Sequence, residues 1–532
     1  MNFVKKFFSE WKWTILSGVV ILLLALGLRL YNLTLLPVFA DEAIYIRWAQ
    51  VMGNEPTLRF LPLSDGKQPL FMWILMFYVR YLSDPLFAGR LLSVVSGLGT
   101  MTGIFAVSHL LFKSKKVSLI AVLIWAISPF SFFFDRMALV DSLLATFSVW
   151  TIFFGVLTAK YARFDFAMLA GFFLGGAFLT KSPALFVALL MPSTWIFASW
   201  EKSPRKNIVT VIKLGALLAA TYVIAYGFYN ILRLGPNFHL LTSRTADYVF
   251  PISHLWTDPK DPFIFHIKQI FTDWFIKMGP WPILGLGLIG LWVNWKKHWK
   301  EALFLLTWFF FPVLIQSEYA KVSTVRYILY TLPPAFILAA GALNGLKTKW
   351  LQITAYGFLI LFVFTALRFN YLLLTDPEKA NLPSSEKSGY LEEWTAGTGI
   401  WEVADFLKTE QIKNPDAKIV VGTEGYFGTL PDGLQMYLSD TPEITVIGVG
   451  LDFTDIPQSL KESFESGNKT YLVVNHSRIN IKEKDYRKFG LKLISSYKKS
   501  DRREKESREY ILKGPFETLY LFEIITSVDE NN

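Results

Sequence analysis

The sequence predicts a polytopic α-helical membrane protein with a soluble α/β domain at its carboxyl end. Apolar runs of near-membrane length recur between residues 13 and 374 and then stop. Only 18% of the 532 residues are charged, whereas 52% are hydrophobic and the mean hydropathy is +0.36. Soluble domains carry about 25% charged residues. Beyond residue 375 the composition becomes mixed and charged, and short strand-like runs alternate with helical patterns.

Eleven apolar runs are predicted to span the membrane, because about 20 residues cross a hydrocarbon core of ~30 Å. They cover residues 13–33, 85–112, 117–134, 143–159, 164–180, 183–200, 208–232, 280–295, 302–316, 327–346 and 350–374. Another run, 70–82, is too short to cross comfortably. We expect it to form an interfacial or re-entrant helix within a long first loop, 32–84, and we expect a second long loop at 233–279.

The distribution of basic residues in the short connections predicts the orientation. One set of helix ends carries most of them, among them Lys12, Lys113, Lys115, Lys116, Lys160, Arg163, Lys202, Arg205, Lys206, Lys297, Lys300 and Lys349. The opposite short connections hold only Arg136, Lys181, Lys321 and Arg326. Because basic residues accumulate on the inner side, the sequence predicts a multi-pass protein of the cell membrane with a cytoplasmic amino terminus. An odd number of spans then places the carboxyl-terminal part outside.

The carboxyl-terminal part divides into a polar linker, 376–395, and a domain of mixed composition, 396–532, which follow the membrane domain 1–375. Strands are predicted at 418–422, 444–449, 470–475, 491–497 and 518–524. Helical patterns at 400–409 and 456–466 lie among them. Alternating strands and helices favour a compact extracytoplasmic α/β domain.

Two motifs in the first loop carry candidate chemistry. Asp41 and Glu42 stand among apolar neighbours just after the first span, where partial desolvation raises the proton affinity of a carboxylate and suits it to act as a base. The alternative is that the two carboxylates are simply solvated at the membrane interface. Lys67 precedes the short apolar helix. It is either a lysine that extends to lipid headgroups or a cation directed at a lipid-borne phosphate.

Further charged residues fall on the same predicted face. Arg136 and Asp141 bracket an apolar tetrapeptide between the third and fourth spans, and an internal ion pair is the simplest alternative for them. Lys181 lies in the tight connection between the fifth and sixth spans, and Arg326 precedes the tenth. Each residue alone is weak evidence, but the predicted topology gathers all of them at one external interface.

This combination suits a substrate that is both lipidic and anionic, such as a polyprenyl-phosphate sugar. The cations would stabilise the departing phosphate, and one carboxylate would deprotonate an acceptor in a single inverting displacement. The six histidines show no metal-ligand spacing, and the sequence leaves open whether a divalent metal takes part. The absence of cysteine excludes disulfides and a thiolate nucleophile. The net charge of +10 fits cytoplasmic loops, so we expect no nucleic-acid partner.

Four stretches within roughly the first 370 residues resemble glycosyltransferase family 39, the GT-C group that contains protein O-mannosyltransferases and lipid A aminoarabinose transferases. They are Asp41-Glu42, Gly66-Lys67-Gln68-Pro69-Leu70, Arg136 to Asp141-Ser142, and Leu179-Thr180-Lys181. The resemblance implies a polyprenyl- or dolichyl-phosphate sugar donor, an external site, and a protein, lipid or glycan acceptor. By position it implies Asp41 as the base with Glu42 and Asp141 as acidic partners. The implied donor-phosphate contacts are Lys67, Arg136, Lys181 and Arg326.

Two other functions are possible for a polytopic protein of this composition. A transporter or flippase for a lipid-linked sugar predicts ionisable residues near mid-membrane and discontinuous helices in related halves. The candidate charges lie instead at predicted helix ends. A non-catalytic scaffold that presents the α/β domain would leave the external cluster of charges unexplained.

Overall fold

The computed structural model describes residues 2–295, 297–344, 346, 348–502 and 508–526. The chain forms two compact units. Unit 1 comprises Met1–Asn32, Thr57–Ile74 and Arg90–Pro383. Unit 2 comprises Leu33–Pro56, Leu75–Gly89 and Ser384–Asn532.

Unit 1 is helical. Its helices, three of which have residues in unit 2, are α1 (Asn2–Leu30), η1 (Pro56–Leu58), η2 (Leu61–Asp65), α3 (Leu70–Tyr81), α4 (Pro85–Phe112), α5 (Lys115–Ile127), α6 (Pro129–Phe134), α7 (Val140–Tyr161), α8 (Phe164–Thr180), α9 (Ala184–Leu190), η3 (Met191–Phe197), α10 (Pro204–Asn230), η4 (Ile231–Leu234), α11 (Leu240–Ser243), α12 (Thr245–Tyr248), α13 (His254–Thr257), α14 (Phe263–Gln269), η5 (Ile270–Trp274), α15 (Phe275–Lys277), α16 (Trp281–Asn294), α17 (Trp299–Tyr319), η6 (Val325–Thr331), α18 (Leu332–Gly341), α19 (Lys349–Thr375) and η7 (Pro377–Lys379).

Six described helices are long and apolar enough to cross a membrane. They are Ser9–Leu30, Pro85–Phe112, Val140–Tyr161, Pro204–Leu234, Trp299–Tyr319 and Lys349–Thr375. The pair Phe263–Lys277 and Trp281–Asn294, bent by 107°, would make a seventh. The predicted class, a polytopic helical membrane protein, is therefore confirmed.

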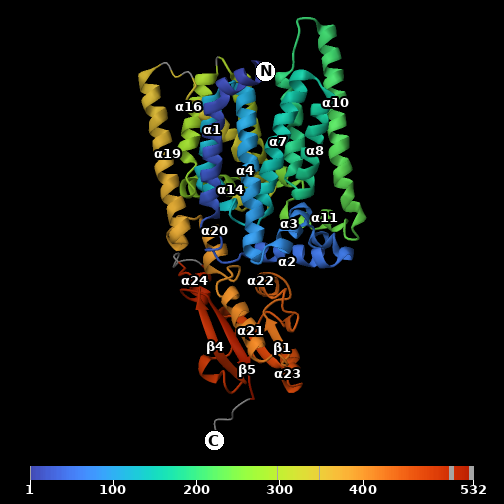
Figure 1. Ribbon diagram of the computed structural model, residues 1–532, viewed down its shortest axis with the longest axis vertical. Helices are drawn as coiled ribbons and strands as arrows, with labels where there is room; N and C mark the ends of the chain where they lie inside the picture. The colour runs from blue at the N-terminus through green and yellow to red at the C-terminus, as the bar shows by residue number, and fades with distance from the viewer. Residues whose placement is uncertain (1, 296, 345, 347, 503–507, 527–532) are drawn as a thin grey trace. The chain divides into compact units, whose positions relative to one another are not determined.

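Helix packing in unit 1 depends on small side chains. Helix α8 packs between α7 and α10, and these helices run side by side in Figure 1. On α16, a side chain at Gly285 would meet Phe358 of α19 at 2.8 Å, and one at Gly290 would collide with the backbone of α18. The glycine-rich stretch 285–290 therefore serves close helix approach, as small residues commonly do in membranes.

The predicted spans match the structure best where proline is absent from the interior. Helices α4 and α8 have the predicted bounds. The run predicted at 117–134 is instead divided between α5 and α6 at Ser128, whose ψ of 126° is extended. Pro129 follows, and a residue before proline avoids the helical region. The run predicted at 183–200 changes from α9 to the 3-10 helix η3 at Met191, which precedes Pro192 but keeps helical backbone angles.

Unit 2 contains a five-stranded sheet in the order β2-β1-β3-β5-β4. β1 pairs in parallel with β2 and β3, while β5 is antiparallel to β3 and β4. The strands are β1 (Ile419–Thr423), β2 (Ile444–Gly448), β3 (Lys469–Asn475), β4 (Leu491–Lys498) and β5 (Thr518–Ile524), so all five predicted strands are confirmed. Its other elements are α2 (Ala40–Asn54), α20 (Ser384–Lys387), η8 (Ser388–Glu392), α21 (Ile400–Lys413), α22 (Thr429–Tyr437), α23 (Gln458–Glu465), η9 (His476–Arg478), η10 (Glu483–Asp485) and α24 (Arg508–Lys513).

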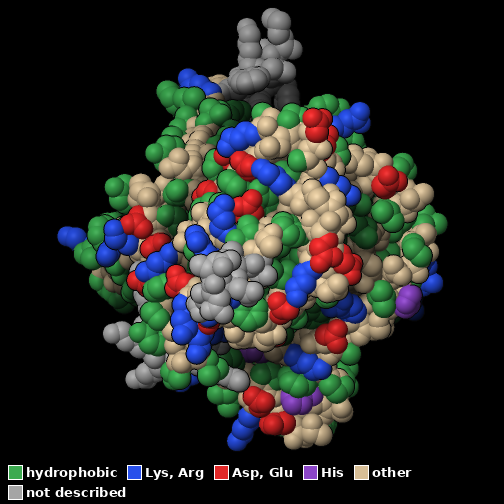
Figure 2. Space-filling view, turned by 90° about the horizontal axis from the view of Figure 1, so that it is seen from below, with side chains coloured by type: hydrophobic (Ala, Val, Ile, Leu, Met, Phe, Trp, Pro, Cys, Tyr) green, Lys and Arg blue, Asp and Glu red, His purple; other side chains and the backbone are tan. Residues whose placement is uncertain are grey.

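Helices α2 and α22 are the longest helices of unit 2 that were not predicted from the sequence. Helix α2 begins inside what we expected to be loop, and α22 follows β1. The two helices pack against each other, and their contact includes a hydrogen bond from Arg47 Nε to Gln435 Oε1 of 3.2 Å. On the face drawn in Figure 2, basic and acidic side chains are intermixed, which is usual for a solvated surface.

Candidate active site

The seven predicted site residues divide between the two units. Asp41 and Glu42 belong to unit 2, where they occupy the first turn of α2. Glu42 is fully buried, and its Oε2 accepts a hydrogen bond of 3.0 Å from the backbone N–H of Phe39, which closes this turn. Asp41 is only partly buried. A helix amino terminus stabilises negative charge, so both carboxylates occupy a favourable position.

The start of α2 is fixed by a short antiparallel pairing within unit 2. The N–H of Ala40 donates to the carbonyl of Thr395 at 3.1 Å, and the N–H of Gly397 donates to that of Val38 at 2.8 Å. The ring of Phe39, which lies between these bonds, stacks on Tyr390 at a centroid distance of 4.4 Å. The carboxyl-terminal part of the chain therefore determines where the first turn of α2 begins.

Lys67 lies in unit 1 after a tight turn. Helix η2 ends at Gly66, whose φ of +66° favours glycine. Asp65 lies 3.3 Å from Lys67 Nζ and also pairs with Arg244. A side chain at Gly66 would approach the carbonyl oxygen of Leu240 to 3.1 Å. Glycine is thus required here both by the backbone conformation and by the lack of space.

Asp141 and Lys181 are brought together in unit 1. Asp141 lies in the first turn of α7, Lys181 caps the carboxyl end of α8, and Lys181 Nζ lies 2.6 Å from Asp141 Oδ1. The same ammonium lies 4.1 Å from the ring centroid of Tyr327, while the Arg326 guanidinium carbon is 5.8 Å from that ring. Asp141 Oδ2 is buried and accepts no hydrogen bond from any described residue. Three of the predicted residues therefore form one cluster.

A hydrogen bond connects this cluster to the Lys67 segment. Gln68 Nε2 donates to Ser182 Oγ at 2.8 Å, which joins the residue after Lys67 to the residue after Lys181. Both polar side chains also line a cavity of about 740 Å³. Aromatic groups form much of its wall, and its lining includes Phe178, Tyr226, Tyr229, Phe250 and Lys321. A largely apolar cavity with a few polar groups is a usual ligand site.

Arg136 has a different environment. Its Nη1 donates to the carbonyls of Leu28, Arg29 and Tyr31 at 3.1, 2.6 and 2.8 Å, and its Nη2 donates to that of Asn32 at 2.8 Å. The last carbonyls of a helix have no partner within the helix. Arg136, which is 2% exposed, therefore completes the carboxyl end of α1.

The buried ion pair beside Arg136 was not predicted from the sequence. Arg29 Nη2 lies 3.0 Å from Asp135 Oδ2, both side chains are fully buried, and Ser142 Oγ donates to Asp135 Oδ1 at 2.8 Å. The alternative of an internal ion pair thus applies to Asp135 rather than to Arg136 with Asp141. The available signal was Arg29, a charge in the last turn of an otherwise apolar helix. Among the described residues, no three His, Asp or Glu side chains are grouped as metal ligands.

The helical fold, with these charges at helix ends, defines a polytopic helical membrane protein. The crystal structure of ArnT from Cupriavidus metallidurans bound to undecaprenyl phosphate shares this fold. Its TM-score is 0.55 at 14% identity, and the match covers 99% of this chain and 100% of that one.

The sequence comparison is more specific. Residues 66–226 match the family model described as dolichyl-phosphate-mannose-protein mannosyltransferase. A Proteus mirabilis protein named undecaprenyl phosphate-alpha-4-amino-4-deoxy-L-arabinose arabinosyl transferase 2 is 26% identical over 339 residues, which are 59% of this chain and 58% of that protein. A transferase of the same name, without the numeral, comes from Pectobacterium atrosepticum. It is 26% identical over 296 residues, which are 51% of this chain and 50% of that protein. The chain thus spans less than two thirds of these relatives, and the predicted resemblance to glycosyltransferase family 39 is confirmed.

Proposed function

We propose that the protein is an integral-membrane glycosyltransferase that transfers a sugar from a polyprenyl-phosphate donor to a protein, lipid or glycan acceptor. The observation that carries the proposal is the cluster of Asp141, Lys181 and Arg326, joined to Lys67 by the bond from Gln68 to Ser182. The adjoining apolar cavity suits a lipid chain. The sequence similarity to aminoarabinose transferases supports the same donor class.

The proposed reaction is a single displacement with inversion. An acceptor hydroxyl or amine attacks the anomeric carbon, its proton passes to Asp41, and the bond from that carbon to the phosphate oxygen breaks. Lys67, Lys181 and Arg326 stabilise the charge that collects on the departing phosphate. Glu42 shapes the first turn of α2 beside Asp41, and Asp141 orients Lys181. Because Arg136 is engaged by carbonyl oxygens, we assign it the fixing of α1 rather than phosphate contact.

We propose the following topology. Eleven helical segments cross the bilayer within a membrane domain, 1–375, and the amino terminus is cytoplasmic. The loops 32–84 and 233–279, the linker 376–395 and the α/β domain 396–532 lie on the outer face. The asymmetric distribution of lysine and arginine supports this orientation. Cysteine-accessibility labelling at positions 10 and 405 in sealed cells would test it, because only the second position should react from outside.

The decisive experiment uses full-length protein in nanodiscs with a series of radiolabelled undecaprenyl-phosphate sugars, and it measures release of undecaprenyl phosphate. Asp41→Asn keeps the shape and removes the base, so the rate should fall at least about 100-fold. Asp405→Asn, at an exposed position of α21, is the matched control. Wild-type turnover by Asp41→Asn would refute the assignment of the base. Movement of labelled lipid between leaflets without phosphate release would instead support a flippase.

A further inference from the structure

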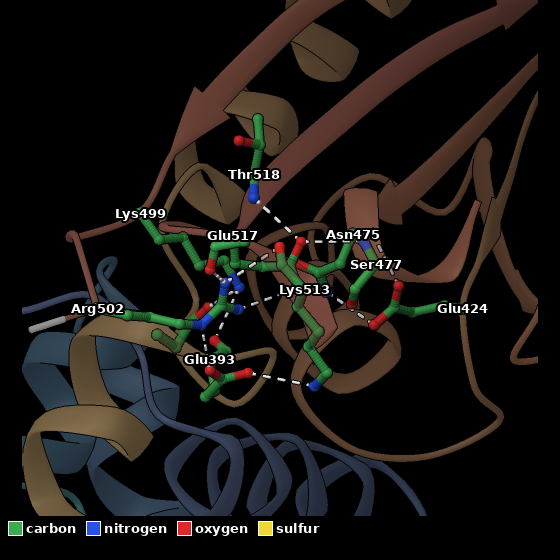
Figure 3. A network of polar contacts seen from close by, with 11 residues as sticks. Glu393, Glu424, Asn475, Ser477, Lys499, Arg502, Lys513, Glu517 and Thr518 are labelled. Atoms are coloured by element: carbon green, nitrogen blue, oxygen red, sulfur yellow. Dashed lines mark hydrogen bonds and ion pairs between the residues drawn. The ribbon is translucent and has the colours of Figure 1, made fainter. Parts of the chain in front are cut away.

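Two basic side chains are buried where strand β4 ends (Figure 3). Lys499 and Arg502 are 3% and 5% exposed. Lys499 Nζ donates to the carbonyl oxygens of Glu393 at 3.0 Å and Ala396 at 2.7 Å, while Arg502 Nε donates to Glu393 Oε1 at 2.6 Å. Both cations therefore bind one short segment, 393–396.

The same cations are fixed to the sheet on their other side. The Lys499 N–H donates to the carbonyl of Glu517 at 2.9 Å, and Arg502 Nη2 lies 3.7 Å from Glu517 Oε2. Glu517 is 1% exposed, and its Oε1 accepts from the N–H groups of Ser477 at 3.0 Å and Thr518 at 3.1 Å. Residues at the ends of β3, β4 and β5 thus fix the two cations, and the cations bind the segment 393–396.

That segment determines where α2 begins. Thr395 and Gly397 make the two backbone hydrogen bonds to Ala40 and Val38, immediately before Asp41. The approach is so close that a side chain at Gly397 would lie 2.6 Å from the Val38 carbonyl oxygen. Two chain segments in such close contact transmit a displacement of one to the other, because packed protein has little free volume.

The rest of α2 is held by other contacts. Gln50 Nε2 donates to the Met436 carbonyl at 2.9 Å, and Arg47 contacts Gln435 of α22. The segment 393–397 therefore supports the first turn of α2, whereas α22 supports its remainder. Loss of the buried cations should loosen the first turn and leave the helix docked.

On the basis of the proposed function, we infer that Lys499 and Arg502 are positioning residues, which hold the segment 393–397 and through it orient the Asp41 carboxylate. A buried charge is costly, and an apolar side chain of similar volume often serves stability as well or better. Two cations bound to backbone carbonyls and to Glu393 instead fix the path of the chain. Burial also lowers the pKa of Lys499 to about 8.

The test compares Lys499→Met with Lys492→Met in full-length protein. Lys492 lies on β4, the strand that ends just before Lys499, in a half-exposed pair with Glu523. Hydrogen exchange should accelerate at least about tenfold at the amides of Ala40 and Gly397 in Lys499→Met. It should stay unchanged near Met52. The turnover number should fall about 10- to 100-fold with the donor KM within about twofold, as expected when a reacting group is misplaced, and Lys499→Arg should restore part of it.

Each outcome decides between the explanations. Faster exchange with a wild-type turnover number would overturn the positioning role and leave the proposed function standing. Unchanged exchange would overturn the coupling itself. If Lys499→Met does not fold, Gly397→Ala perturbs the same segment from its other side, and wild-type turnover in that variant would refute the inference. A wild-type protein that uses no lipid-phosphate sugar would instead overturn the proposed function and, with it, this role.

Discussion

Replacing Lys499 by methionine should change how the stability of unit 2 depends on pH. Burial is the main reason that the pKa of Lys499 falls from 10.5 to about 8. Glu517, Glu424 and Glu393 face the ammonium and oppose this decrease, while Arg502 adds to it. The folded protein therefore carries a charge at neutral pH that costs more than the same charge in the unfolded chain.

The size of the effect follows from the two pKa values. The pKa of Lys499 is about 8 in the folded protein and 10.5 in the unfolded chain. At low pH this difference lowers the free energy of unfolding by about 3 kcal/mol. Between these values the unfolded chain binds more protons than the folded one, so stability rises with pH as Lys499 is deprotonated. From pH 7 to pH 9 the gain amounts to about 1 kcal/mol. Methionine cannot titrate, so this gain should be absent from the variant.

The measurement is thermal unfolding of full-length wild type and Lys499→Met in nanodiscs at pH 7 and pH 9. For a domain of the size of unit 2, a gain of about 1 kcal/mol in the free energy of unfolding raises the unfolding temperature by roughly 2–4 °C. The wild-type midpoint should therefore rise by that amount relative to the variant. Comparing the two proteins at each pH cancels the titration of other groups, and Lys492→Met should show no such change. If the wild-type midpoint minus that of Lys499→Met stays constant or falls from pH 7 to pH 9, the assigned pKa shift is refuted.

Three further predictions concern unit 1. Arg136→Gln should lower the free energy of unfolding by about 1–3 kcal/mol, because it leaves buried carbonyl oxygens at the end of α1 without their donor. The donor KM should stay within about twofold, and a raised KM with normal stability would restore Arg136 as a phosphate contact. Gly97→Ala should destabilise by about 1–3 kcal/mol, because its methyl group would collide with the Asp135 carboxylate; an unchanged unfolding midpoint would contradict this. Lys181→Met alone should impair donor turnover and folding more than Lys181→Met combined with Asp141→Asn. The single change leaves the buried Asp141 carboxylate without its cation, whereas the double change removes both charges. A double-mutant cycle without coupling would refute it.

Much of the fold was predictable because its signals are local. The strands of unit 2 are short runs of branched and aromatic residues between turn residues, and all five appear as predicted. Helix α2 was not predicted because its N-cap residue is Phe39, whose side chain has no hydrogen-bond acceptor. The Ser, Thr, Asp or Asn that usually marks the start of a helix is therefore absent. Helix α22 had a weak signal in Asp432, whose carboxylate accepts from the Gly428 N–H at 2.7 Å.

The part played by each charge was harder to predict than its place in the chain. Arg136 and Asp141 were correctly marked as costly charges at helix ends, and each does have a specific environment. Which partner each would choose depends on residues far away in the sequence. Arg136 binds carbonyls more than 100 positions earlier, and Asp141 pairs with a lysine 40 positions later.

The neighbours Asp135 and Arg136 illustrate why spacing alone could not separate structural from reactive charges. Both lie in one turn between apolar helices, yet Asp135 neutralises Arg29 while Arg136 binds backbone carbonyls of residues 28–32, that of Arg29 included. Two adjacent residues thus stabilise the same end of α1 by different means. Asp141 retains one oxygen without a hydrogen bond from any described residue, and its lysine lies beside an aromatic ring. The Asp141–Lys181 pair differs from the Asp135–Arg29 pair in its place, because the residue after Lys181, Ser182, lines the cavity. In the proposed function it is therefore Lys181, and not a buried cation at the end of α1, that meets the donor phosphate.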